Sequence, residues 1–258
     1  MAVAPDPDDI YERAAEEGRR RLGMSLVRQT TTGFIAGVTI VFGIVALGVT
    51  EALVEPTLGG GVATIVGALA FAIGVVFLIV GRTELFTENF FDPVAAAIED
   101  RRSRPWGRLI RLWVVTLFVN LIGGAVLVAV LTVEGALPAG SSEVLVGVAE
   151  EVVGKGWPAT LARAVLAGAL LTLLSYMLEA VDTVTARILV AYLVGFFLAL
   201  GPFDHVVVSA LHVLFGIWLS DAVSYSDLAS NIGLSTLGNL VGGLLLITLT
   251  HTAQVKDG

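Results

Sequence analysis

Long apolar stretches, separated by short polar segments, form the main pattern along this chain. Six of them approach or exceed the length of about 20 apolar residues that a membrane-spanning helix needs. They cover roughly residues 32–52, 61–81, 109–131, 158–178, 188–219 and 231–250. The pattern therefore predicts an all-α polytopic membrane protein with six transmembrane helices.

Polar residues interrupt two of the six predicted spans. In the fifth, which is too long for one simple span, Gly-Pro precedes Asp204 and His205 in the sequence GPFDH. In the second, the sequence GRTELFTENFFDP is followed by a further short apolar segment. Gly-Pro stops an incoming helix, and we expect Asp204 and Asp92 to cap the half-helices that follow. Irregular backbone at membrane depth is tolerated only where it is buried or lines a cavity, so both breaks mark a candidate solute path.

A short motif recurs after both breaks. Asn120 opens the sequence NLIGG in the third span, and Asn239 opens NLVGG in the sixth. Leu85 precedes Asn120 by 35 residues, and His205 precedes Asn239 by 34. Small residues also serve close helix packing in any membrane protein, but the matched spacing favours a duplicated unit of three spans. Because three is an odd number, the second copy is expected to be inverted, with the solute path at the interface between the repeats.

Composition and charge agree with a membrane protein. Hydrophobic residues make up 56% of the chain and charged residues 15%, whereas soluble domains have about 25% charged residues. The chain has no cysteine, which excludes disulfides and thiolate metal sites. Basic residues gather before the first span, in the connection that contains Arg101, Arg102 and Arg104, between the fourth and fifth spans, and at the end of the chain. The positive-inside rule then predicts that both termini are cytoplasmic.

These patterns predict that the chain has three parts. Residues 1–28 form a predicted cytoplasmic N-terminal amphipathic segment, in which Asp8 or Asp9 is the expected cap. Residues 29–251 form a membrane channel domain, with repeats at about 29–133 and 157–251. Residues 252–258 form a short cytoplasmic tail.

The segments LFTEN, FDHVVVSA and the two NLxGG motifs, in this order over roughly residues 25–250, resemble the formate/nitrite transporter family. The resemblance implies an aquaporin-like fold with two broken helices in an inverted three-helix repeat. It also implies homopentamers in a prokaryotic inner or plasma membrane, and passage of small monovalent anions of weak acids such as formate or nitrite. Its pore residues would be the central His205, the facing Leu85, Phe86 and Thr87, and the constriction residues Phe71 and Leu198.

The chain departs from the family pattern next to the central histidine. The usual HSxAN reads HVVVS here, so Val206 replaces a small hydroxyl residue and Ser209 stands where an amide is expected. Gly168 stands where many members place a pore asparagine. These departures bear on the identity of the substrate more than on the fold.

A weak-acid pore has a simple physical basis. A bare anion loses its hydration at a large cost in an apolar constriction, whereas a protonated acid loses far less. Burial favours neutral His205 and a nearby anion favours its charged form, so the substrate itself could switch on a proton donor. Asp204 could hold the ring, and His212, two helical turns later, could extend a polar track.

Other candidate residues have less support from the sequence. Glu88 fits a pore mouth and a buried, hydrogen-bonded position equally well, and Arg82 could pair with Glu84 or with Glu88. Asn120 and Asn239 are further candidate pore residues because of their places in the repeat.

Two other function classes stay open. A channel for small neutral solutes would make His205 structural, and the polar residues lost after His205 favour it. An intramembrane enzyme using Asp204, His205 and His212 would need a further group, for which Thr87 and Glu88 are candidates. The sequence contains no metal-ligand spacing, nucleotide motif or catalytic triad. We therefore expect a non-enzymatic protein without cofactor, metal or nucleic acid, whose partners are a small anionic or weak-acid solute, the lipid bilayer and copies of the chain.

Overall fold

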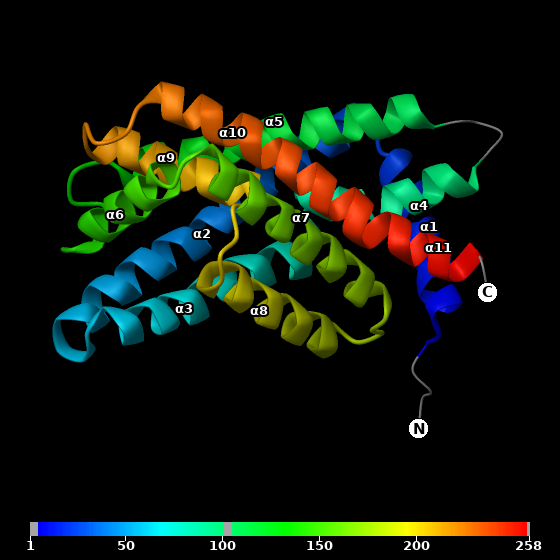
Figure 1. The fold of residues 1–258 in the computed structure, drawn as a ribbon, viewed down its shortest axis with the longest axis horizontal. Helices are drawn as coiled ribbons and strands as arrows, with labels where there is room; N and C mark the ends of the chain where they lie inside the picture. Colours follow the sequence, from blue (N-terminus) through cyan, green and yellow to red (C-terminus); the bar gives the residue numbers. More distant parts are fainter. Residues whose placement is uncertain (1–4, 101–104, 257–258) are drawn as a thin grey trace.

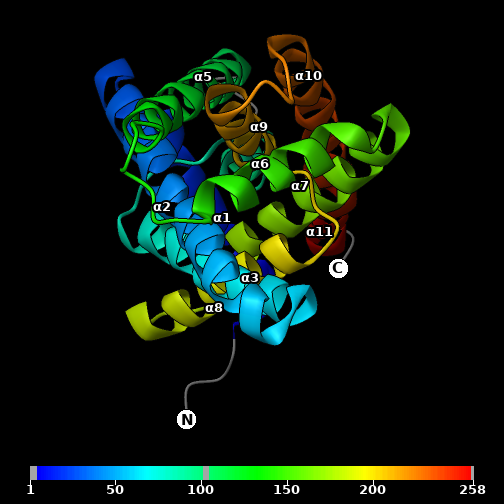
Figure 2. The ribbon, with the colours of Figure 1, turned by 90° about the vertical axis from the view of Figure 1, so that its left-hand side faces the viewer.

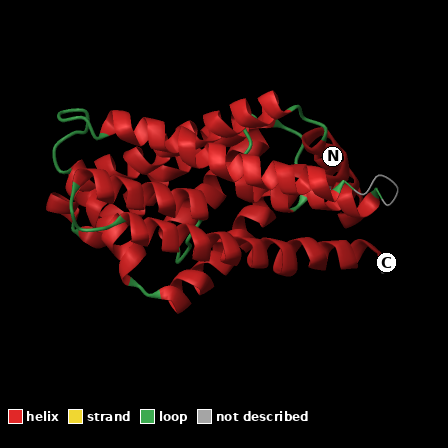
Figure 3. Cartoon of the chain, turned by 90° about the horizontal axis from the view of Figure 1, so that it is seen from above, coloured by secondary structure: helices red, strands yellow, loops and turns green. Residues whose placement is uncertain are grey.

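The computed structural model describes residues 5–100 and 105–256, and the regular elements in these residues are helices (Figure 3). The predictions that involve Arg101, Arg102 and Arg104 lie outside the described residues. In chain order the elements are α1 (Pro7–Leu22), α2 (Leu26–Leu58), α3 (Gly60–Val80), the 3-10 helix η1 (Phe86–Phe90), α4 (Asp92–Glu99), α5 (Trp106–Leu131), α6 (Ser141–Gly154), α7 (Trp157–Glu179), α8 (Val184–Leu200), α9 (Val206–Leu219), α10 (Tyr225–Val241), the π-helix η2 (Gly242–Thr248) and α11 (Leu249–Lys256) (Figure 1).

The described residues contain the predicted spans. Five helical units are long and apolar enough to cross a membrane: α2, α3, α5, α7 and the continuous unit Tyr225–Lys256. The fifth predicted span is present as two shorter apolar helices, α8 and α9, on either side of its break. The second span, α3, is followed by η1 and α4 across its own break. The prediction of six spans with two broken ones is therefore confirmed.

Helix ends differ from the predicted ones because capping side chains, and not hydropathy, set them. Ser25 Oγ accepts a hydrogen bond from Arg28 N at 3.3 Å, so α2 already begins at Leu26. Ser224 forms a capping box with Asp227, so the last span begins at Tyr225 and then continues to Lys256. The boundaries predicted at residues 28/29 and 251/252 therefore fall inside helices.

Helix α1 is amphipathic, as predicted, and its apolar face packs against α4. Its cap is Asp6 and not Asp8 or Asp9, because Asp6 Oδ1 accepts a hydrogen bond from Asp9 N at 2.9 Å. Its buried face is formed by Ile10, Tyr11, Ala14, Ala15, Gly18 and Leu22. Helix α1 also contacts α11, so the two terminal helices lie at the same end of the bundle, as an even number of spans requires (Figure 1).

The half-helices that follow the breaks lie inside the bundle. Helix α9 packs against α5, α6 and α10, and α6 covers it at the end of the bundle that faces the viewer in Figure 2. Helix α4 packs against α1 at the other end of the bundle. Helices α3 and α8, which precede the two breaks, pack against each other. This arrangement brings the two break segments together in the interior.

Two glycines allow the full spans to approach the repeated motifs. A Cβ atom on Gly37 would overlap the backbone of Asn120, and one on Gly168 would overlap the backbone of Asn239. Small residues permit this close approach of membrane helices. Gly168, which replaces the asparagine expected from the resemblance, therefore serves contact between α7 and α10.

Candidate functional site

Two cavities enter the bundle from opposite ends. We call the first the α1-side cavity; it measures about 90 Å³, and α1 contributes Glu17, Arg20 and Arg21 to its wall. The second, the opposite cavity, measures about 180 Å³, and its wall includes Glu51 of α2 and Glu151 of α6. Both volumes are large enough for several water molecules. None of the residues that line one cavity also lines the other, so the bundle is closed between them.

His205 and Thr87 meet in the closed region, one from each break. Thr87 Oγ1 lies 2.6 Å from His205 Nε2, and both side chains are buried. His205 also lines the opposite cavity. Leu85 and Phe86, which precede Thr87, are buried in the same hydrophobic core as Phe71, Leu198 and Val206. The contact therefore lies in an apolar barrier at the inner end of the opposite cavity.

The hydrogen bonds of His205 indicate its tautomer. Its Nδ1 accepts a hydrogen bond from Val208 N at 3.3 Å, and a backbone N–H can only donate. A neutral His205 therefore has its proton on Nε2, which then donates to Thr87 Oγ1. This leaves the hydroxyl proton of Thr87 free to reach another acceptor, and places a chain of two polar hydrogens in the barrier.

His205, and not Asp204, is the N-cap of α9. The prediction that Asp204 caps this half-helix and holds the imidazole ring was wrong. Instead, Asp204 Oδ1 accepts a hydrogen bond from Lys155 Nζ at 2.6 Å, an ion pair that is almost fully buried. The ammonium group of Lys155, next to α7, competes for the carboxylate and turns it away from the helix end. Asp204 and Lys155 both line the opposite cavity.

Asn120 and Asn239 fix the two break segments. Asn120 Oδ1 accepts a hydrogen bond from Phe86 N, and Asn239 Oδ1 accepts one from Val206 N, both at 2.9 Å. Both asparagines are fully buried, and neither lines the two cavities. The repeat predicted that both asparagines line the pore. They instead support the break segments from behind the residues that line the cavities.

Four of the remaining predicted pore residues lie in the wall of the opposite cavity. Phe71, Leu198, Ser209 and His212 line the opposite cavity together with His205. Ser209 Oγ lies 2.9 Å from both His205 O and Asn231 Oδ1, so its single proton has two acceptors. Asn231 of α10, which accepts the hydrogen bond from Ser209, does not itself line the opposite cavity. His212 is buried, and its Nδ1 has no hydrogen-bond partner in the described part of the chain.

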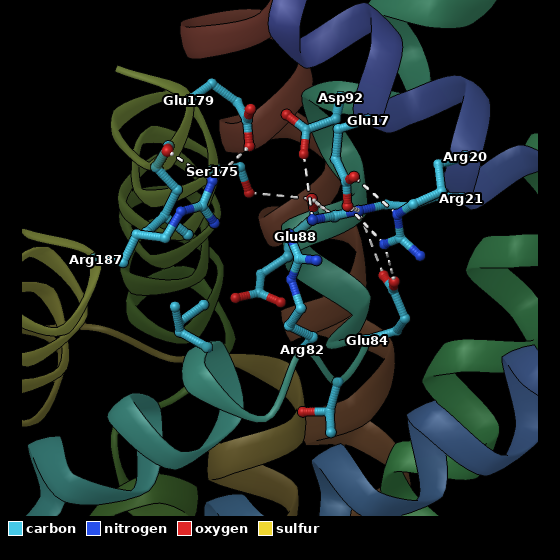
Figure 4. Close-up of a pocket in the computed structure, with 13 residues that line it drawn as sticks. Glu17, Arg20, Arg21, Arg82, Glu84, Glu88, Asp92, Ser175, Glu179 and Arg187 are labelled. Carbon is cyan, nitrogen blue, oxygen red and sulfur yellow. Dashed lines mark hydrogen bonds and ion pairs between the residues drawn. The ribbon is translucent and has the colours of Figure 1, made fainter. Parts of the chain in front are cut away.

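The α1-side cavity is rich in charge (Figure 4). Glu84 pairs with Arg20 at 3.0 Å and with Arg21 at 3.5 Å, and Arg21 also pairs with Asp92 at 3.3 Å. The prediction that Asp92 caps α4 was wrong, because Asp92 is already the first helical residue and its side chain faces Arg21. The predicted pairing of Arg82 with Glu84 or Glu88 was also wrong, since no ion pair joins them in the described residues.

Several residues of the site were missed from the sequence. Lys155 was seen only as an exception to the charge pattern, and Arg20 and Arg21 only as topology signals. Their contacts with Asp204 and Glu84 connect segments that are 49 and about 64 residues apart. A pattern of periodicity contains no signal for such contacts. Over the described ranges, no three His, Asp or Glu side chains form a group that could hold a metal ion.

Known proteins are similar to this chain in sequence and in fold. The model of the formate/nitrite transporter family matches residues 8–253. A probable formate transporter of Methanothermobacter thermautotrophicus is 30% identical over 84% of this chain and 85% of its own length. The inner membrane protein YfdC of Escherichia coli is 24% identical over 96% of this chain and 78% of its own. A solved pentameric formate channel with formate bound is similar with a TM-score of 0.71 at 18% identity, over 89% of this chain and 97% of that one.

The fold and the closed site between two cavities define a polytopic membrane channel with an aquaporin-like arrangement of broken helices. The chain belongs to the formate/nitrite transporter family. The resemblance inferred from LFTEN and FDHVVVSA is therefore confirmed. Members of this family are transporters and not enzymes, which removes the intramembrane enzyme built on Asp204, His205 and His212.

Proposed function

We propose that the chain is a channel for small monovalent anions of weak acids, such as formate or nitrite, in which His205 supplies the proton that carries the substrate through the apolar barrier. The observation that supports it most is the contact between His205 Nε2 and Thr87 Oγ1 at 2.6 Å. This contact lies where the path is closed and apolar, which is where an anion would meet its largest desolvation cost.

The opposite cavity suits an anion that approaches His205. The basic side chains of Lys155 and Arg163 lie in its wall beside the acidic Glu51, Glu151 and Asp204, and the N-terminal end of α9 contributes positive partial charge beside the imidazole. The basic side chains and the helix end attract the anion toward the ring. The anion in turn favours imidazolium over imidazole, because an opposite charge nearby stabilises the ionised form.

Proton transfer then follows from charge balance. A proton from water converts His205 to imidazolium, which passes that proton to the anion and returns to neutral imidazole. The product is the neutral acid, which crosses the barrier formed by Leu85, Phe86 and their neighbours far more cheaply than the anion. On the other side it dissociates again. Net movement is one anion and one proton.

The membrane setting follows from the sequence and the relatives. The positive-inside rule supports a cytoplasmic location for α1 and α11, and hence for the α1-side cavity. One relative is an inner membrane protein, which supports the same location here. A pentamer with one pore in each protomer is supported by the pentameric formate channel of similar fold.

Flux measurements on the purified protein in liposomes test the proposed function. A pH-sensitive dye inside the vesicles would report addition of formate, nitrite, acetate or chloride, and light scattering would report glycerol. Fast acidification with a weak acid, and little response to chloride or glycerol, is the expected result. Rapid glycerol flux without acidification would instead identify a channel for neutral solutes.

A further inference from the structure

Glu88 is a buried carboxyl group that the proposed pore chemistry does not use. It follows Thr87 directly in the chain and lines the α1-side cavity, whereas Thr87 contacts His205 within the barrier. Its exposed fraction is 3%, and Oε1 is buried without a hydrogen-bond partner. Figure 4 shows the carboxyl group lying between Arg187 and the cluster around Arg21. Glu88 is therefore placed at the junction of the barrier and the cavity.

The backbone of Glu88 is held by two side chains, whereas its carboxyl group has no cationic partner among the described residues. Its carbonyl oxygen accepts hydrogen bonds from Arg21 Nη1 at 2.9 Å and from Ser175 Oγ at 3.1 Å. These two bonds come from α1 and α7 and fix the position of residue 88 in η1. The side chain then extends into the cavity, where its carboxyl group has a backbone hydrogen bond from Leu85 but no ion pair with a cationic side chain of the described residues. A purely structural buried carboxylate would be expected to have an ion pair or hydrogen bonds to both oxygens, because its desolvation is costly.

Glu84 provides a direct contrast within the same cavity. Its exposed fraction is 2%, close to that of Glu88, but its carboxylate is held by Arg20 and Arg21. Two acidic side chains of equal burial thus differ in one respect, namely that only Glu84 has cationic partners in the described chain. The carboxyl group of Glu84 is thus occupied by ion pairs, whereas that of Glu88 is available for exchange with the contents of the cavity.

Charged groups from α1, α4, α7, α8 and the connection between α3 and η1 line the cavity together with Glu88. The basic groups come from α1, the turn after α3, and α8: Arg20, Arg21, Arg82 and Arg187. The acidic groups come from α1, the segment before η1, α4 and α7: Glu17, Glu84, Asp92 and Glu179. Most of these groups pair among themselves, but Arg82 has no partner in the described residues. An unpaired base and an unpaired acid thus share the cavity next to the barrier.

We propose that Glu88 is the proton-exchange group of the α1-side cavity. A neutral weak acid that leaves the barrier transfers its proton to the Glu88 carboxylate, which gives a substrate anion and the Glu88 carboxylic acid. The carboxylic acid then releases the proton to water in the cavity and is regenerated as carboxylate. Transport in the other direction reverses both steps. Arg82 stabilises the anion while it is still in the cavity.

This role rests on the proposed weak-acid function and adds a second protonation site to it. His205 serves the opposite cavity and Glu88 serves the α1-side cavity, and Thr87, which contacts His205, directly precedes Glu88 in the chain. Each cavity then contains one titratable group at the barrier. The exchange of a proton with a positioned side chain typically accelerates a reaction about 10²- to 10⁴-fold, so loss of Glu88 would slow release where it limits flux.

The test uses three full-length variants in liposomes loaded with a pH-sensitive dye and driven by a formate gradient. Glu88→Gln removes the exchangeable proton, Glu88→Asp keeps an acid at the site, and Glu84→Gln removes an equal charge from the same cavity. The initial rate of acidification is measured over a series of pH values set equal on both sides. Size-exclusion chromatography reports assembly of each variant.

We expect Glu88→Gln to lower the rate about tenfold or more and to flatten its pH dependence. Glu88→Asp should keep the shape of the wild-type pH profile at a lower rate, and Glu84→Gln should also keep that shape. A Glu88→Gln variant with the wild-type rate and profile would overturn the role of Glu88, as would assembled Glu88→Asp with a flat profile. If Glu88→Gln does not assemble, the Glu88→Asp profile decides. A wild-type protein inactive with every weak acid would instead overturn the proposed function itself.

Discussion

Asn120 and Asn239 make the same three hydrogen bonds in the two halves of the molecule. The Asn120 Nδ2 group donates to Gly33 O at 2.8 Å and to Glu84 O at 3.0 Å. The Asn239 Nδ2 group donates to Ala164 O at 2.8 Å and to Asp204 O at 3.0 Å. Each amide therefore ties the preceding break to a neighbouring full span. The equality of the two sets supports a duplicated structural unit.

Replacement of either asparagine by alanine should destabilise the protein by a similar amount. Each change removes the side-chain partner of the two backbone groups in the break segment, Phe86 N and Glu84 O or Val206 N and Asp204 O, and an unsatisfied buried group costs about 1–3 kcal/mol. We expect a clear drop in the thermal midpoint of both Asn120→Ala and Asn239→Ala, with Thr250→Ala, at an exposed position of the last span, as the control. If one asparagine variant kept the wild-type midpoint, the two breaks would not be supported equivalently.

Variants of the ion pair between Lys155 and Asp204 can distinguish an effect on stability from an effect on anion attraction. Lys155→Met leaves the buried carboxylate of Asp204 unpaired, and breaking a buried pair in this way costs about 3–5 kcal/mol. The double variant Lys155→Met/Asp204→Asn removes both charges and should recover most of the thermal midpoint. Its formate flux at low concentration should stay reduced, because the ammonium group of Lys155, next to His205 in the opposite cavity, is lost and Arg163 is the remaining basic side chain of its lining. Full recovery of flux in the double variant would show that Lys155 only holds Asp204.

Glu17 makes the docking of α1 sensitive to acid. Burial raises the pKa of its carboxyl group, but hydrogen bonds from Arg20 and the charges of Arg21 and Arg20 outweigh burial and lower this pKa from 4.5 to about 2. The unfolded segment therefore binds a proton at a higher pH than the docked one. The stabilisation is fully present above pH 4.5 and is lost as the pH falls toward about 2.

Hydrogen exchange of the α1 amides measures this effect. Wild-type protein should show faster exchange in α1 as the pH is lowered through that window, after correction for the intrinsic rate. Glu17→Gln should already exchange fast at neutral pH and should show a smaller additional change. Identical pH dependence in both proteins would mean that Glu17 does not link α1 to its surroundings.

Much of the fold was predictable because each part of it depends on local pattern. Span number follows from apolar length, the breaks from Gly-Pro and from polar runs, and the duplication from the spacing of Asn120 and Asn239. The N-cap of α9 was not predictable in the same way. Asp204 and His205 can both accept from a helix N-terminus, and Lys155, from a distant connection, takes the carboxylate.

The candidate site was predictable in its residues more than in their relations. The contact between Thr87 and His205 was expected from the resemblance, and the two atoms do meet. The sequence left two interpretations of Glu88 open, and its lack of a cationic partner depends on where Arg20, Arg21 and Arg82 lie in three dimensions. Such choices among long side chains are made by tertiary packing and are not encoded in periodicity or spacing.

The measurement that tests the central claim most directly is formate-driven acidification of liposomes containing the His205→Asn variant. Asparagine keeps a polar side chain at the barrier, but its amide group does not gain or lose a proton near neutral pH as imidazole does. With assembly unchanged on size-exclusion chromatography, the rate should fall by about 10²-fold or more relative to wild type. A His205→Asn channel that acidifies the vesicles at the wild-type rate would contradict the role of His205 as proton donor.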